Sequence, residues 1–155
     1  MTVNEKPTAA RKSRLPARLN VVTFGVRDLP TVRSFYEALG WRSRSVGDEF
    51  ARFEIGGAVL ALYSLDALAE EANMPLPAAT ERFAGFTCAV VVQDEEMVDA
   101  AIELVREAGG RILAEPVARE WGGRSGYFAD PEGNVWEIAW LPGSSFDERG
   151  GLIWP

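Results

Sequence analysis

The strongest constraint on the fold of this chain is that its two halves repeat one order of elements. Each half reads as a strand, a helix and three further strands, and the residues that open the two helices, Asp28 and Asp94, are offset by 66 positions. One such unit leaves a sheet face uncovered, so two units are expected to pack together and to leave a cleft between their sheets. The pattern therefore predicts an α+β fold of two paired βαβββ modules.

Cap and turn residues set the element boundaries. Asp28 and Asp94 are typical N-cap residues, and Gly40 and Gly109-Gly110 end the helices that follow them. A third helix over 65–73 begins at Ser64 or Asp66. The apolar stripe of the second-half helix is predicted as Met97, Ala101, Leu104 and Val105. The expected strands cover 19–26, 41–47, 50–55, 58–63, 86–92, 111–118, 125–129 and 134–140.

These boundaries predict five segments. They are a disordered basic tail (1–18), a first module (19–64), a helix and linker (65–84), a second module (85–141) and a C-terminal tail (142–155). The last segment reads as an extended tail that packs through Leu152, Ile153 and Trp154.

Charge and apolar content exclude several classes of partner. The net charge is −7, of which the first 20 residues contribute +4 and the remainder −11. An acidic body of this kind argues against nucleic-acid binding. The sequence shows no secretory signal and no apolar run of the roughly 20 residues that span a bilayer, so no membrane partner is expected. A single cysteine, Cys88, is typical of the reducing cytoplasm.

The chain contains no histidine. This excludes the commonest general base, the commonest transition-metal ligand and every Ser-His or Cys-His arrangement. Any chemistry must use carboxylates, arginine, lysine, tyrosine or an external cofactor.

One carboxylate stands in an unusual place. The segment DPEGNVWEIAW (130–140) is a tight turn followed by a strand. Alternation places Val135, Glu137 and Ala139 on one face of that strand, so Glu137 lies among apolar neighbours, where an unpaired charge is costly.

The segments VRDLPTVRSFYEALGW (26–41) and GYFADPEGNVWEIAW (126–140) together resemble the vicinal oxygen chelate superfamily of glyoxalases, bleomycin resistance proteins and ring-cleaving dioxygenases. The similarity covers about residues 19–141 and includes an uncharacterised branch with a WGGRSGYFADPEG-type segment. The resemblance implies two paired βαβββ modules whose curved sheets surround a ligand cup, and a homodimer.

The resemblance also implies where metal ligands would stand. Metal-dependent members take their ligands from the first and last strands of each module, which correspond here to Val21, Ala61, Thr87 and Glu137. Only Glu137 matches, and a lone carboxylate does not make a site for Zn, Fe, Ni or Mn. We therefore expect no metal and no cofactor, which excludes the usual glyoxalase I, fosfomycin-resistance and extradiol-dioxygenase activities.

Without a metal, Glu137 has three interpretations. It is an unused remnant, a structural partner of Arg119, Arg124 or a hydroxyl, or a ligand-binding or general-base group. Small residues on the matching strand faces (Val21, Thr23 and Gly25, and Thr87, Ala89 and Val91) favour an open cup. The predicted ligand-binding residues are Thr23, Tyr63, Thr87, Trp121, Arg124, Tyr127 and Glu137, with Glu137 as the candidate catalytic residue.

Two functions follow from this reasoning. The leading hypothesis is a metal-independent small-molecule-binding protein of the sequestering, bleomycin-resistance type. The rival is a metal-free lyase or isomerase in which Glu137 moves a proton and Arg124 or Tyr127 stabilises an enolate-like charge. A third alternative is a structural or regulatory dimer with a collapsed cup. The sequence names no ligand.

Overall fold

A computed structural model describes residues 15–45, 47–78 and 83–155. Most of the predicted basic tail (residues 1–14) and part of the linker (residues 79–82) lie outside the described residues. The first module contains β1 (Val21–Val26), α1 (Leu29–Ala38), β2 (Ser43–Ser45), β3 (Phe50–Ile55) and β4 (Ala58–Ser64), and α2 (Leu65–Glu71) follows it. The second contains β5 (Cys88–Val92), α3 (Glu95–Glu107), β6 (Arg111–Ala118), β7 (Arg124–Ala129) and β8 (Val135–Trp140).

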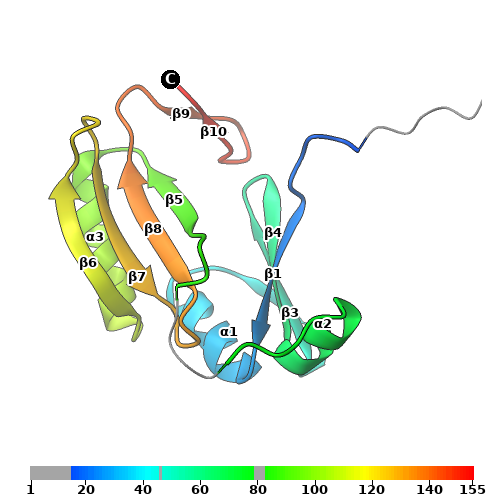
Figure 1. The fold of residues 1–155 in the computed structure, drawn as a ribbon. Helices are drawn as coiled ribbons and strands as arrows, with labels where there is room; N and C mark the ends of the chain where they lie inside the picture. The colour runs from blue at the N-terminus through cyan, green and yellow to red at the C-terminus, as the bar shows by residue number, and fades with distance from the viewer. Residues whose placement is uncertain (1–14, 46, 79–82) are drawn as a thin grey trace, which may run out of the picture.

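The two modules share one topology, which confirms the predicted duplication. The N-terminal sheet has the order β1-β4-β3-β2 and the C-terminal sheet the order β5-β8-β7-β6. In each sheet the first strand pairs in parallel with the last, and the remaining pairs are antiparallel. Figure 1 shows the two sheets side by side, with α1 between them at one end and α3 on the outer face of the C-terminal sheet.

The predicted helix caps are present. Asp28 accepts a hydrogen bond from the Thr31 amide at 3.1 Å, and Asp94 accepts one from the Met97 amide at 2.9 Å. Gly40 follows α1 with a φ of +90°, a conformation that glycine adopts without steric cost. Of the two candidates for α2, Ser64 is the cap.

The apolar stripe predicted for α3 is wrong in part: Val105 is buried and Ala101 packs against the core, but Met97 and Leu104 do not. The residues that α3 buries are Val98, Ile102 and Val105, whereas Met97 and Leu104 are each 42% exposed. The helix carries apolar residues on two adjacent stripes, and helical spacing alone does not say which one faces the sheet.

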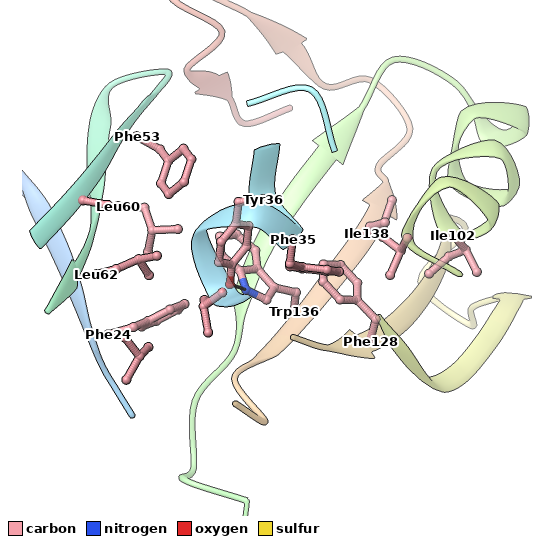
Figure 2. Packing of buried hydrophobic residues seen from close by; sticks show 14 of the residues in the cluster. Phe24, Phe35, Tyr36, Phe53, Leu60, Leu62, Ile102, Phe128, Trp136 and Ile138 are labelled. Carbon is pink, nitrogen blue, oxygen red and sulfur yellow. Dashed lines mark hydrogen bonds between the residues drawn. The ribbon is translucent and has the colours of Figure 1, made fainter. Parts of the chain in front are cut away.

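Aromatic packing joins the modules through α1. Figure 2 shows Phe35 and Tyr36 of α1 between residues of the N-terminal sheet and residues of the C-terminal sheet. The Phe35 and Phe128 rings are 6.2 Å apart, and Trp136 is 6.0 Å from both Tyr36 and Phe24. The core is therefore continuous across the two modules.

Polar contacts reinforce this junction. The buried Tyr36 hydroxyl donates to Asp130 Oδ2 at 2.7 Å and accepts from Trp136 Nε1 at 2.9 Å. Glu132 Oε1 accepts from the amides of Arg27 and Asp28, each at 2.8 Å. The FYEALGW and DPEGN segments, which lie about 100 positions apart along the chain, are thus direct partners in space.

Two features around the sheets were not predicted. Residues 145–153 form a hairpin of β9 (Ser145–Phe146) and β10 (Leu152–Ile153) rather than an extended tail. Helix α2 packs on the β1 face that contains Gly25, where an added Cβ would lie 2.8 Å from Leu65 Cδ1. Figure 1 places α2 on the side of the N-terminal sheet away from the C-terminal sheet. Among the described residues, no helix is long and apolar enough to cross a membrane.

Candidate functional site

A cavity of about 1390 Å³ lies on the face of the C-terminal sheet opposite α3. Its floor is formed by Ala89, Val91, Tyr127, Glu137 and Ala139. The walls include the β3–β4 turn of the N-terminal sheet, the β9–β10 hairpin and charged residues of the first module, namely Arg42, Arg44 and Glu54. Alternation along β5 and β8 places these small residues and Glu137 on the same face, as the sequence predicted.

Glu137 and Tyr127 form the polar centre of this floor. They are directly opposite each other on β8 and β7, and the Tyr127 hydroxyl donates to Glu137 Oε1 at 2.9 Å. Among the described residues, Tyr127 is the one hydrogen-bond partner of the Glu137 side chain, which leaves Oε2 able to accept a further hydrogen bond.

The surroundings keep Tyr127 as a donor. Burial, and then the adjacent Glu137 carboxylate, raises the pKa of Tyr127 above its usual value, and Arg119 opposes this shift. The phenol therefore stays protonated at neutral pH and orients Glu137.

Arg119 is a site residue for which the sequence suggested another role. Its Nε donates to Ser125 Oγ at 2.8 Å, and its guanidinium carbon lies 5.7 Å from the centre of the Tyr127 ring. It therefore supports Tyr127 by a cation–π contact rather than pairing with Glu137. The sequence feature that could have indicated this role is the position of Arg119 in the same β6–β7 connection as Trp121.

Trp121 lines the cavity, and Gly123 leaves room for its indole ring. A Cβ at Gly123 would fall 1.7 Å from Trp121 Cζ3 and 2.3 Å from the Trp140 carbonyl oxygen, so the indole lies over a position that only glycine can occupy. Trp121 lines the cavity and is 51% exposed.

The structure thus brings Trp121, Tyr127 and Glu137 together and places the other predicted residues elsewhere. Thr23 and Tyr63 occupy the same face of the N-terminal sheet as Gly25, the face that α2 covers in part. Tyr63 donates there to Glu71 of α2 at 2.9 Å. On this sheet, the small residue Gly25 makes room for a helix rather than for a ligand.

Thr87 and Arg124 also lie outside the cavity lining. Thr87 is exposed and immediately precedes β5. Arg124 binds Asp99 of α3 through two hydrogen bonds of 2.7 Å, so its side chain is on the helix-covered face of the C-terminal sheet. Neighbouring residues of a strand point to opposite faces, and Arg124 differs in parity from Tyr127.

The cavity does not offer a set of metal ligands. The neighbours of Glu137 on the adjacent strands are Ala89 and Tyr127. No group of three or more histidine, cysteine, aspartate or glutamate residues is placed to hold an ion anywhere in the described part of the chain. One carboxylate with a neutral phenol does not match the donor sets of Zn²⁺ or Fe²⁺ sites.

The fold and the cavity define a class of protein: two βαβββ modules of the same topology, with a cavity floored by one concave sheet. The model of the Glyoxalase/Bleomycin resistance protein/Dioxygenase superfamily matches residues 18–138. The chain belongs to this superfamily.

Solved structures agree with this assignment. A glyoxalase-related enzyme from Fulvimarina pelagi is similar with a TM-score of 0.80 and 31% identity, over 90% of this chain and 99% of that one. A glyoxalase/bleomycin resistance protein/dioxygenase from Nocardioides has a TM-score of 0.68 and 29% identity, over 85% and 89% of the two chains. A family enzyme from Burkholderia phytofirmans, at 22% identity and a TM-score of 0.70 over 81% and 99%, shares the fold. No curated protein matches the chain.

Proposed function

We propose that this protein is a metal-independent small-molecule-binding protein of the sequestering type. The observation that carries the proposal is the cavity of about 1390 Å³, whose floor is apolar except for the Tyr127–Glu137 pair. A large apolar cavity with few polar groups is typical of ligand sites, because burial provides affinity and the polar groups fix orientation.

The Tyr127–Glu137 pair indicates which chemical group of a ligand would bind there. Glu137 Oε1 is occupied by Tyr127, whereas Oε2 faces no other donor among the described residues. A ligand that carries an ammonium, amidinium or N–H group would pair with Oε2 in a partly desolvated place, where such a bond is stronger than in water.

The proposal is tested by a thermal-shift screen of small amines, antibiotics and metabolites. A ligand should raise the melting temperature in proportion to the logarithm of its concentration. Glu137→Gln should weaken binding of a cationic hit by about tenfold or more, since it removes a charged acceptor. Glu103→Gln on the exposed surface of α3 is the matched control and should leave binding unchanged. A screen without any hit would contradict the proposal.

Metal independence has its own measurement. Elemental analysis of protein purified without chelators should find less than stoichiometric transition metal, and ligand binding should survive treatment with a chelator. Stoichiometric metal that is lost together with binding would refute this part of the proposal.

The alternative function is a metal-free lyase or isomerase. It is favoured by one observation, the orientation of Glu137 by a protonated tyrosine. Glu137 would remove a proton from a carbon next to a carbonyl through Oε2. As the carboxylate takes up that proton, the Tyr127 hydroxyl would leave Glu137 Oε1 and donate its one hydrogen bond to the charge that develops on the substrate oxygen. If a turnover assay is found, unchanged turnover in Glu137→Gln would exclude this function.

We also propose a homodimer. Within one chain, the Glu137 face of the C-terminal sheet lines the cavity, whereas the Thr23 face of the N-terminal sheet is covered in part by α2. Large apolar residues at the start of the modules are exposed, among them Leu19 (68%), Val21 (49%) and Phe86 (54%). Burial of such residues against a second copy would stabilise a dimer. Sedimentation velocity would show a mass near 17.0 kDa for a monomer, the result that contradicts this proposal.

A further inference from the structure

The β9–β10 hairpin is an organised part of the cavity wall. Asp147 accepts hydrogen bonds from the amides of Arg149 (2.9 Å) and Gly151 (2.7 Å), which fixes the tip of the hairpin. An added Cβ at Gly56 would lie 3.3 Å from the Arg149 carbonyl oxygen, so this tip rests against the β3–β4 turn of the other module. Figure 1 shows that the hairpin lies between the end of β8 and the N-terminal sheet, and its residues line the cavity.

The hairpin has a cavity side and an outer side. Phe146 and Leu152 are paired across the two strands, and both line the cavity. Ile153 pairs with Ser145 on the opposite side and does not line it. Trp154 follows with the parity of Leu152 and lines the cavity again.

Two indoles at this cavity are unusually open to solvent. Trp154 is 72% exposed and Trp121 is 51% exposed, although both line the cavity. Exposed tryptophan gains most from contact with a flat ring, because its large apolar face adds stacking to simple burial. The family match ends at residue 138, so the hairpin belongs to the part of the chain outside the shared module pair.

We propose that the β9–β10 hairpin is the specificity-determining wall of the cavity and that, with Trp121, it selects ligands with a flat aromatic ring system. This inference rests on the proposed binding function. It assigns the two ends of the ligand to different parts of the molecule: the ring to the hairpin side, and a donor or cationic group to Glu137. A flat ring should be preferred over a saturated ring of similar polarity by about threefold to tenfold.

The test compares 1-naphthylmethylamine with its saturated analogue, decahydro-1-naphthylmethylamine, by isothermal titration calorimetry. The two share an aminomethyl group and differ in the ring. Wild-type protein should bind the naphthyl compound more tightly. Trp154→Ala and Leu152→Ala should remove most of this preference, whereas Ile153→Ala, of the same strand but on the outer side, should keep it. All three residues are at least 39% exposed, so the variants should fold, which thermal melts verify.

The outcomes separate this inference from the proposed function. Glu137→Gln should weaken both amines to a similar degree and leave the ring preference intact. If Trp154→Ala and Leu152→Ala bind both amines as wild type does, the hairpin inference is wrong, while the binding function stands. Failure of the naphthyl compound to bind wild type up to its solubility limit also overturns the inference. If Glu137→Gln changes nothing while the ring preference remains, the Glu137 anchor is wrong and the hairpin inference stands.

Discussion

Replacement of Tyr36 by phenylalanine should weaken the junction between the two modules. The hydroxyl is fully buried, donates to Asp130 Oδ2 at 2.7 Å and accepts from Trp136 Nε1 at 2.9 Å. Its loss would leave the indole N–H of Trp136, a residue only 2% exposed, without a partner. Asp130 would keep the hydrogen bonds from the Glu132 amide and from Asn134, so its carboxylate would still have donors.

These contacts set the expected magnitude. A hydrogen bond to a charged group contributes about 1.5–3 kcal/mol, and a buried donor without a partner costs about 1–3 kcal/mol. Because both effects arise from one hydroxyl and the site relaxes in part, we expect Tyr36→Phe to lower the free energy of unfolding by about 3 kcal/mol. That is a large share of the stability of a typical domain.

Urea denaturation followed by circular dichroism measures this change. The midpoint should fall with little change in the slope, since the area exposed on unfolding is the same. Tyr63→Phe is the matched control: it removes a phenol that donates to Glu71 on the surface, and its midpoint should equal that of wild type. A loss below about 1 kcal/mol in Tyr36→Phe would refute the view that this network locks the modules.

Three further outcomes are expected. Gly123→Ala should lower the melting temperature and shift tryptophan emission, because the new Cβ would overlap the Trp121 ring and the backbone of Trp140; an unchanged melt would contradict this geometry. Arg124→Ala should leave ligand binding unchanged in calorimetry, because Arg124 pairs with Asp99 on the far face of the sheet; weakened binding would place Arg124 in the site. Burial and then the Asp130 carboxylate raise the pKa of Tyr36, so above about pH 10 the unfolded chain releases a proton that the folded chain keeps. The free energy of unfolding should therefore fall as the pH rises through this range, and Tyr36→Phe should make that decline shallower in urea titrations; an equal decline would refute the assignment.

Much of the fold could be predicted because the signals are local. Asp28 and Asp94 cap the helices, and Gly40 and Gly109 follow them with positive φ, since these residues satisfy or release backbone constraints within a few positions. The stripe of α3 could not be chosen in the same way. Both candidate stripes are apolar, and only the sheet that packs against Ile102 decides between them.

The candidate site, too, could be predicted only where it depends on a local pattern. Strand parity predicted that Glu137 shares a face with Ala139 and lies near the small residues Ala89 and Val91, because side chains alternate along a strand. That Tyr127 lies opposite Glu137 depends on the register of β7 and β8. Parity could not tell which module's face remains open. The Gly25 face is covered in part by α2. Arg124 donates to Asp99 of α3, and the position of α3 beside β7 is set by packing rather than by any local sequence pattern.

The sequence by itself determined the duplicated modules, the absence of histidine and a single carboxylate at the family ligand positions, since each is a matter of residue type and order. Only the tertiary structure decided where the cavity lies, that Arg119 supports Tyr127, and that residues 145–153 close over it as a hairpin. Those features depend on contacts between segments distant along the chain, and such contacts are set by packing of the whole molecule rather than by any local pattern.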